Sequence, residues 1–136
     1  MEEITLEEDI KVFCETAKSF PDGIMEAHRE LHSIVPLPDE RRYFGISRPN
    51  DKGIIIYQAA AEEIYQGEAE ELGCNTFVIK GGKYISLLVP DYINDVQGIR
   101  KAFQKLTSHP GIDPNGYCIE LYLNEKDVKC MIRLRE

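Results

Sequence analysis

The chain lacks several features that would assign it to a class at once. No apolar run approaches the roughly 20 residues that a membrane-spanning helix needs. The N-terminus is acidic where a secretory signal is basic, so we expect no signal peptide. Lys and Arg form no dense cluster and the net charge is −8, which disfavours direct nucleic-acid binding because that binding requires phosphate neutralisation. The sequence predicts a cytoplasmic protein without a membrane segment or a DNA-binding domain.

Paired metal-binding or disulfide motifs are also missing. The four cysteines, Cys14, Cys74, Cys118 and Cys130, are far apart and form no CxxC pair, which favours reduced, buried thiols. His28 and His32 are four residues apart, but the segment is not HExxH and no third ligand is apparent. We therefore expect neither a metal site nor a cofactor.

What is present is typical of a globular protein. The 136 residues are 43% hydrophobic and 29% charged, which predicts a single domain over residues 1–136 with a substantial core. Residues 1–9 are interpreted as an acidic lead-in, and residues 62–75 as a solvated surface connection. Periodicity and turn residues predict the other elements: strands over 10–18, 41–47, 53–61, 76–80, 83–89, 117–123 and 130–135, and helices over 24–34 and 96–107.

This order is strand-helix-strand-strand, twice, and the two helices share residues at identical offsets. Gly23-Ile24 is followed by Ala27 and Leu31, and Gly98-Ile99 is followed by Ala102 and Leu106. The sequence therefore predicts an α+β fold of two pseudo-symmetric halves, about 10–61 and 76–135. Antiparallel sheets would carry two helices on one face and form a central groove, a common place for a ligand.

The stretch Tyr117–Leu123 contains the most informative pattern. Side chains of a strand alternate between its faces, so Tyr117, Ile119, Leu121 and Leu123 form one apolar face that should seek a core. The opposite face carries Cys118, Glu120 and Tyr122. A mid-strand carboxylate between a thiol and a phenol is unusual for a solvated face, although an acid on the wet side of a sheet is an ordinary alternative.

The second half resembles the GyrI-like family, the effector-binding domains of multidrug-responsive bacterial transcription regulators, which also occur as stand-alone proteins. The resemblance rests on Val78-Ile79-Lys80-Gly81-Gly82-Lys83-Tyr84, where Lys80 replaces the usual proline, and on Glu120-Leu121-Tyr122-Leu123-Asn124. It covers residues 76–135 well and the first half by topology. In drug-binding relatives the acid at the Glu120 position pairs with lipophilic cations at the bottom of an aromatic pocket.

The resemblance and the residues together define a candidate ligand site. Its members are Glu120 with Tyr122, Tyr57, Tyr84 and Cys118. A buried carboxylate is costly unless it is paired, and a lipophilic cation would offset that cost while tyrosine faces add cation–π contact. The bland alternative for each tyrosine is a half-buried ring with its hydroxyl in water.

Three functions remain open at this point. The first is a stand-alone protein that binds lipophilic compounds, cations in particular, and is linked to transcription regulation or to toxin or drug resistance. The second is a hydrolase of strained alkylating natural products, in which Glu120 would be the catalytic general base. The third is an interaction module that inhibits gyrase, for which the acidic surface would matter, so a separate regulator or gyrase is a candidate protein partner.

Overall fold

The computed structural model describes residues 1–35, 40–95 and 97–136. The chain divides into two compact units, which we describe separately: the 9–79 unit, Asp9–Ile79, and the 80–136 unit, which consists of Met1–Glu8 and Lys80–Glu136. Within the described residues no helix is both long and apolar enough to cross a membrane.

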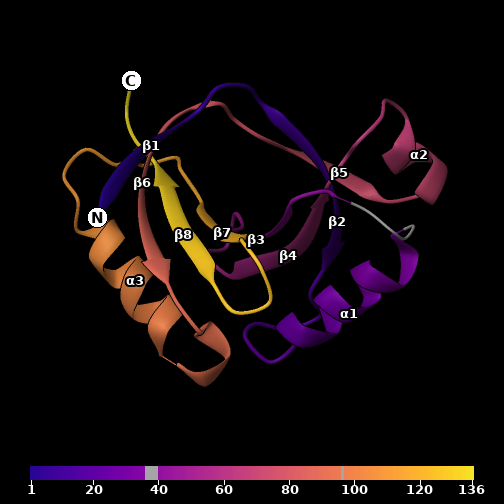
Figure 1. Ribbon diagram of the computed structural model, residues 1–136, viewed down its shortest axis with the longest axis horizontal. Helices are drawn as coiled ribbons and strands as arrows, with labels where there is room; N and C mark the ends of the chain where they lie inside the picture. Colours follow the sequence, from indigo (N-terminus) through magenta and orange to yellow (C-terminus); the bar gives the residue numbers. More distant parts are fainter. Residues whose placement is uncertain (36–39, 96) are drawn as a thin grey trace. The chain divides into compact units, whose positions relative to one another are not determined.

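The 9–79 unit is a four-stranded antiparallel sheet with the strand order β3-β4-β2-β5. Helix α1 packs on β4 and β2 (Figure 1). The sheet and the helix bury Phe13, Leu31 and a group of alanines between them. The elements are β2 (Ile10–Thr16), α1 (Ile24–Ile34), β3 (Tyr43–Pro49), β4 (Ile55–Glu62), α2 (Glu68–Leu72) and β5 (Asn75–Ile79).

The 80–136 unit repeats this plan with the strand order β1-β6-β8-β7, again antiparallel. Helix α3 lies along β6 and β8 (Figure 1). Beneath it are Ile85 and Val89 from β6, and Val128, Cys130 and Ile132 from β8. The elements are β1 (Glu2–Leu6), β6 (Gly82–Val89), the 3-10 helix η1 (Tyr92–Asn94), α3 (Gly98–Thr107), β7 (Cys118–Tyr122) and β8 (Val128–Arg133).

The predicted α+β class with duplicated strand-helix-strand-strand units is confirmed. The shared helix positions are buried in both units: Ala27 and Leu31 in α1, Ala102 and Leu106 in α3. The glycine that begins each shared pattern is required by close packing. A Cβ on Gly23 would lie 2.8 Å from the Ser19 carbonyl oxygen, closer than the roughly 3.5 Å at which non-bonded contacts become favourable.

A kink at Gly81-Gly82 separates β5 from β6, which are two strands with different pairing partners and not one long strand. β5 ends at Ile79 and β6 begins at Gly82, whose φ of 129° is a conformation that L side chains rarely adopt. A Cβ on Gly81 would lie 3.0 Å from the backbone carbonyl carbon of Glu8. The chain passes from one unit to the other at this glycine pair.

Two sequence predictions are wrong. The acidic lead-in contains a strand: β1 pairs with β6, with Ile4 opposite Tyr84, so backbone pairing overrides the acidic composition of residues 1–9. The segment 62–75 is not a solvated loop throughout, because it contains α2. Val96, the first residue of the second predicted helix, lies outside the described residues, and so do Pro36 and Pro38, which follow the first predicted helix in the sequence.

A buried ion pair explains why the acidic segment folds. Arg41 donates two hydrogen bonds of 2.8 Å to the two carboxylate oxygens of Glu68, and both side chains are 1% exposed. Glu68 also accepts the backbone N–H of Ile64, and Arg41 donates to the carbonyl of Glu62. Arg41 keeps the pKa of Glu68 below its usual value, despite the opposing effect of burial. This pairing attaches the first turn of α2 to the sheet.

We expect Glu68→Gln to destabilise the protein by about 3 kcal/mol, because it leaves a buried guanidinium without its counter-charge. The matched control is Glu62→Gln, which breaks the more exposed pair with Arg42 (47% and 24% exposed) and should cost less than about 1 kcal/mol. Urea unfolding at pH 7 measures both. Equal losses would contradict a special role for the buried pair.

The same pair predicts a pH dependence. Because the folded-state pKa of Glu68 is lowered, its contribution to stability is complete above the unfolded-state value of about 4.3 and is lost as the pH falls below it. The stability difference between wild type and Glu68→Gln should therefore shrink as the pH is lowered from 6 to 3. A difference that stays constant over this range would contradict the assignment.

Candidate functional site

The strand register places Glu120 on the side of its sheet that α3 covers. Residues directly opposite each other in an antiparallel pair share a face, and Glu120 is opposite Cys130 while Tyr122 is opposite Val128. Cys130 and Val128 are fully buried in the core beneath α3. Glu120 itself is only 7% exposed. The carboxylate therefore belongs to a largely buried face of β7.

The alternation of faces along β7 is as predicted, and residues on both faces are buried. The core covered by α3 lies on the Glu120 side, and the purely apolar residues lie on the second side. On that second side Ile119 is fully buried opposite Met131, while Leu123, just beyond the strand, is 47% exposed. The partly buried Cys118 and Tyr122 supply enough apolar surface for their face to pack into the core.

Two phenol groups accompany the carboxylate. The Tyr122 hydroxyl donates a hydrogen bond to Oε1 of Glu120. Tyr92, from η1, packs edge-on against Tyr122, with ring centroids 5.6 Å apart and an interplanar angle of 60°. Burial and the negative charge of Glu120 raise the pKa of Tyr92. We call Glu120, Tyr122, Tyr92, Cys118 and Cys130 the Glu120 cluster.

The two thiols of the cluster are poor nucleophiles. Burial, reinforced by the charge of Glu120, raises the pKa of Cys118 to about 11 and that of Cys130 to about 12. Both remain protonated at neutral pH, and the thiolate is the reactive form. All four cysteines are free thiols; Cys14 and Cys130 are buried as the sequence predicts, whereas Cys74 and Cys118 are only partly buried.

We expect Cys118 to be alkylated slowly by iodoacetamide in the native protein, because with a pKa of about 11 only about one thiol in a thousand is ionised at pH 8. Its rate should keep rising above pH 10. Glu120→Gln should speed the reaction at a given pH, since it removes the neighbouring negative charge. Site-resolved mass spectrometry measures the rates, and a plateau near pH 8.5 would contradict this account.

The structure does not bring Tyr84 to the Glu120 cluster. Tyr84 is opposite Arg133 on β8, three residues from Cys130, so its side chain is on the other face of the sheet from Glu120. It is fully buried, and its hydroxyl donates to the carbonyl of Lys80. This contact, together with a hydrogen bond from the Lys80 N–H to the Tyr117 hydroxyl, holds the chain next to the glycine kink.

Tyr57 belongs to the 9–79 unit, where it lies in a second aromatic group. It is 1% exposed on β4, its hydroxyl is hydrogen-bonded to Nε2 of His28 at 2.8 Å, and the ring of Phe20 stacks on it with centroids 6.1 Å apart. Burial, with a smaller effect of His32, lowers the pKa of His28 to about 4, so the imidazole is neutral at pH 7. His32 stacks on Tyr43. The spacing of the two histidines thus serves aromatic packing, and among the residues that the structure describes no group of three potential metal ligands occurs.

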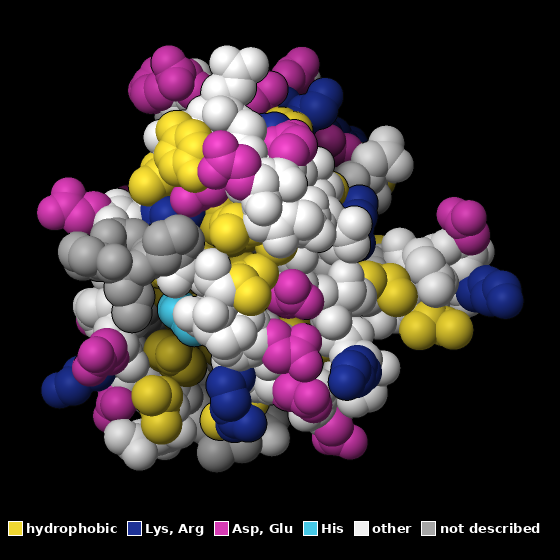
Figure 2. Space-filling model, turned by 90° about the vertical axis from the view of Figure 1, so that its right-hand side faces the viewer, with side chains coloured by type: hydrophobic (Ala, Val, Ile, Leu, Met, Phe, Trp, Pro, Cys, Tyr) yellow, Lys and Arg dark blue, Asp and Glu magenta, His cyan; other side chains and the backbone are white. Residues whose placement is uncertain are grey.

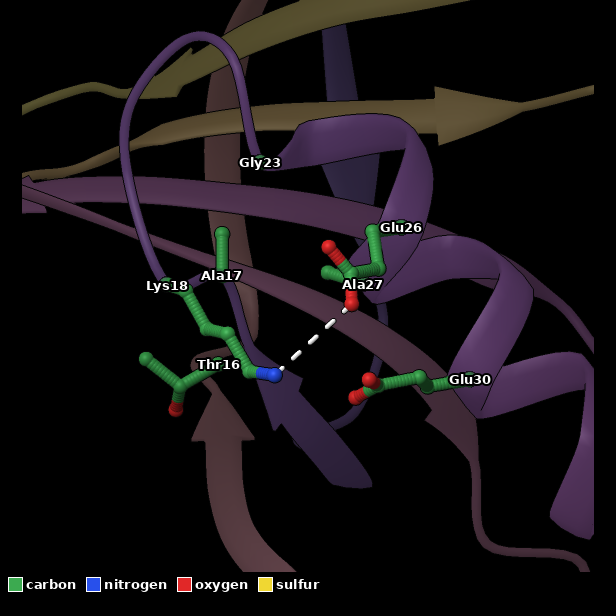
Figure 3. Close-up of a pocket in the computed structure, with 7 residues that line it drawn as sticks. All are labelled: Thr16, Ala17, Lys18, Gly23, Glu26, Ala27 and Glu30. Atoms are coloured by element: carbon green, nitrogen blue, oxygen red, sulfur yellow. Dashed lines mark ion pairs between the residues drawn. The ribbon is translucent and has the colours of Figure 1, made fainter.

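The 9–79 unit also has a shallow surface depression of about 150 Å³ that is partly open to solvent (Figure 3). Its wall includes Glu26 and Glu30 of α1, and Lys18 reaches across it to form an ion pair of 3.7 Å with Glu26. None of the predicted site residues lines it. Its charged side chains are solvated, so it lacks the enclosed apolar lining typical of small-molecule sites.

No protein-family model matches the chain, and a search of curated proteins found no match. Solved structures share its fold. An integron cassette protein from the mobile metagenome of Vibrio cholerae has a TM-score of 0.72 at 13% identity, over 98% of this chain and 95% of that one. The protein SAV2435, bound to tetraphenylphosphonium, has a TM-score of 0.67 at 8% identity, over 98% and 93%.

A third similar structure is a Staphylococcus aureus MU50 protein provisionally described as a bacterial transcription regulation protein. Its TM-score is 0.62 at 12% identity, over 99% of this chain and 97% of that one. At these identities the likeness shows the fold alone. The fold is therefore one that is found with a bound lipophilic cation in one protein and is assigned to regulation in another.

Sequence reasoning missed Tyr92. Residue 92 lies between the predicted strand over 83–89 and the predicted helix over 96–107, and η1 is too short to leave a periodic pattern. A tyrosine next to a predicted helix start carries no local sign that it will reach a strand about 30 residues further on. Glu120, Tyr122 and Cys118, in contrast, share one strand, so their common face follows from alternation alone.

Proposed function

We propose that this protein is a stand-alone GyrI-like small-molecule-binding protein that recognises lipophilic cations through the Glu120 cluster. One observation carries the proposal: a nearly buried carboxylate, Glu120, lies beside the rings of Tyr122 and Tyr92 on the helix-covered face of β7. We further propose that residues 1–136 act as one effector-binding domain in the cytoplasm.

A bound lipophilic cation would offset the energetic cost of burying the Glu120 carboxylate. A carboxylate removed from water loses hydration energy that hydrogen bonds from neutral groups replace only in part. A cation with apolar substituents supplies the opposite charge and loses little hydration itself. Tyrosine rings add cation–π attraction, worth about 1–2 kcal/mol when desolvated.

Two further findings support this choice of ligand. The structure of a protein with the same fold has been solved with tetraphenylphosphonium bound. The surface in Figure 2 is richer in Asp and Glu than in Lys and Arg, in keeping with the net charge of −8, and such a surface concentrates cations near the protein.

The remaining ideas from the sequence stay predictions. A hydrolase that uses Glu120 as a general base, and a gyrase-inhibiting interaction module, are not favoured by any contact described above. A link to transcription regulation, or to toxin or drug resistance, would follow from binding but is a separate property. Tyr57 and its aromatic neighbours lie in the other unit, so the proposal rests on the Glu120 cluster alone.

The test compares two ions of the same shape and opposite charge, tetraphenylphosphonium and tetraphenylborate. We expect the cation to raise the thermal midpoint of the wild-type protein and the anion to have no effect, because only a ligand that binds the native state stabilises it. Glu120→Gln should weaken cation binding at least about tenfold, or about 1.4 kcal/mol, in calorimetric titrations. Gln keeps an acceptor for the Tyr122 hydroxyl and changes only the charge.

Glu125→Gln is the matched control, since it removes the same charge from an exposed position in the turn between β7 and β8. It should bind the cation like wild type. If the cation does not bind the folded wild-type protein, or binds Glu120→Gln equally well, the proposed function is wrong. Equal binding of tetraphenylborate would show that apolar contact, not charge, selects the ligand.

A further inference from the structure

Tyr92 is the one member of the Glu120 cluster that does not come from the sheet, so other contacts must hold it in place. The backbone N–H of Tyr92 donates to the carbonyl of Lys126 at 2.8 Å, and the N–H of Asp91 donates to Oδ1 of Asp127 at 3.1 Å. Both acceptors are in the turn that follows β7. The segment carrying Tyr92 is therefore attached to the turn that follows Tyr122.

Asp127 also organises its own turn. Its Oδ2 accepts a hydrogen bond from the side-chain amide of Asn124, and its backbone N–H donates to Oδ1 of Asn124. The carbonyl of Asp127 accepts the N–H of Leu123, which follows Tyr122 directly. One carboxylate thus connects the segment of Tyr92 with the end of the strand that carries Tyr122 and Glu120.

The backbone is strained at Asp91, the residue whose N–H donates to the Asp127 carboxylate. Asp91 has a φ of 49°, a left-handed conformation that is unfavourable for residues with a side chain. Such conformations persist where surrounding contacts determine them, and they concentrate at functional sites. Here the Asn94 amide donates to the Asp91 carboxylate while Asp127 accepts the Asp91 N–H. The bend of η1 is held from both sides, and Tyr92 is the next residue.

We propose that Asp127 is a positioning residue for ligand binding, which acts by holding Tyr92 against Tyr122 beside Glu120. The identity of the ligand rests on the proposed function, but the positioning of Tyr92 by Asp127 does not depend on it. The turn of β7 and β8 would close without the Asp127 carboxylate, through the Asp127 carbonyl and the Asn124 side chain. Besides its hydrogen bond from the Asn124 amide, the carboxylate adds the contact to Asp91, 36 positions earlier in the chain.

The first experiment needs no ligand. With the tyrosine ring carbons labelled, NMR titration follows the ionisation of Tyr92, whose pKa is raised by burial and by Glu120. Asp127→Ala should lower that pKa toward the usual value of about 10, because Tyr92 moves away from both influences. Asp127→Asn keeps an acceptor for the Asp91 N–H and should keep the raised pKa. An unchanged Tyr92 titration in Asp127→Ala would overturn the proposal.

The second experiment measures tetraphenylphosphonium affinity by calorimetry. We expect about tenfold weaker binding in Asp127→Ala and at most about threefold in Asp127→Asn. The two variants lose the same charge, so an equal loss in both would show direct attraction of the cation by Asp127 and overturn positioning. Glu125→Ala, a carboxylate deletion in the same turn, is the control and should bind like wild type.

A double-mutant cycle tests whether Asp127 acts through Tyr92. In a Tyr92→Leu background, Asp127→Ala should weaken binding by less than about twofold, because the ring that it positions is gone. A full, additive loss would overturn the proposal. Failure of the wild-type protein to bind the cation would refute the proposed function only, since the Tyr92 titration still decides whether Asp127 positions that ring.

Discussion

The pairing register of β7 with β8 decides the chemistry of the 80–136 unit, because it fixes the side of the sheet on which Glu120 lies. With Glu120 opposite Cys130, the carboxylate faces the helix-covered side, together with Cys118 and Tyr122. A slip of one residue would move all three to the other face. The apolar contacts of Val128 and Cys130 beneath α3 oppose such a slip. Core packing therefore keeps Glu120 on the helix-covered face, although burial by itself disfavours a carboxylate there.

The two units pack their helices on their sheets in the same way. Each has a helix that buries an alanine and a leucine at matching positions, α1 and α3, and the glycine that begins each of these two patterns, Gly23 or Gly98, is in close contact with its surroundings. They differ in what the helix-covered face carries. In the 9–79 unit the neutral imidazole of His28 is hydrogen-bonded to the Tyr57 hydroxyl, whereas in the 80–136 unit the carboxylate of Glu120 accepts a hydrogen bond from the Tyr122 hydroxyl.

Two buried carboxylates of this protein, Glu68 and Glu120, have different surroundings. Glu68 is matched by Arg41 in a two-fold hydrogen-bonded pair, and that arrangement is structural, since it attaches α2 to the sheet. Glu120 is surrounded by phenols and thiols, and burial together with its charge raises the pKa values of Tyr92, Cys118 and Cys130. Because of this contrast we assign the first acid to stability and propose a binding role for the second.

The sequence by itself determined the α+β class, the repeated strand-helix-strand-strand order and the shared face of Cys118, Glu120 and Tyr122, because hydrophobic period and strand alternation are local properties. Tertiary structure decided the rest. β1 forms because β6 offers it a partner, and Glu68 is buried because Arg41 reaches it from 27 residues away. Tyr84 was separated from the Glu120 cluster by register, and Tyr92 was added to it by contacts between η1 and a distant turn. Pairing over such distances leaves no periodic trace in the chain, so only the folded protein shows which side chains meet.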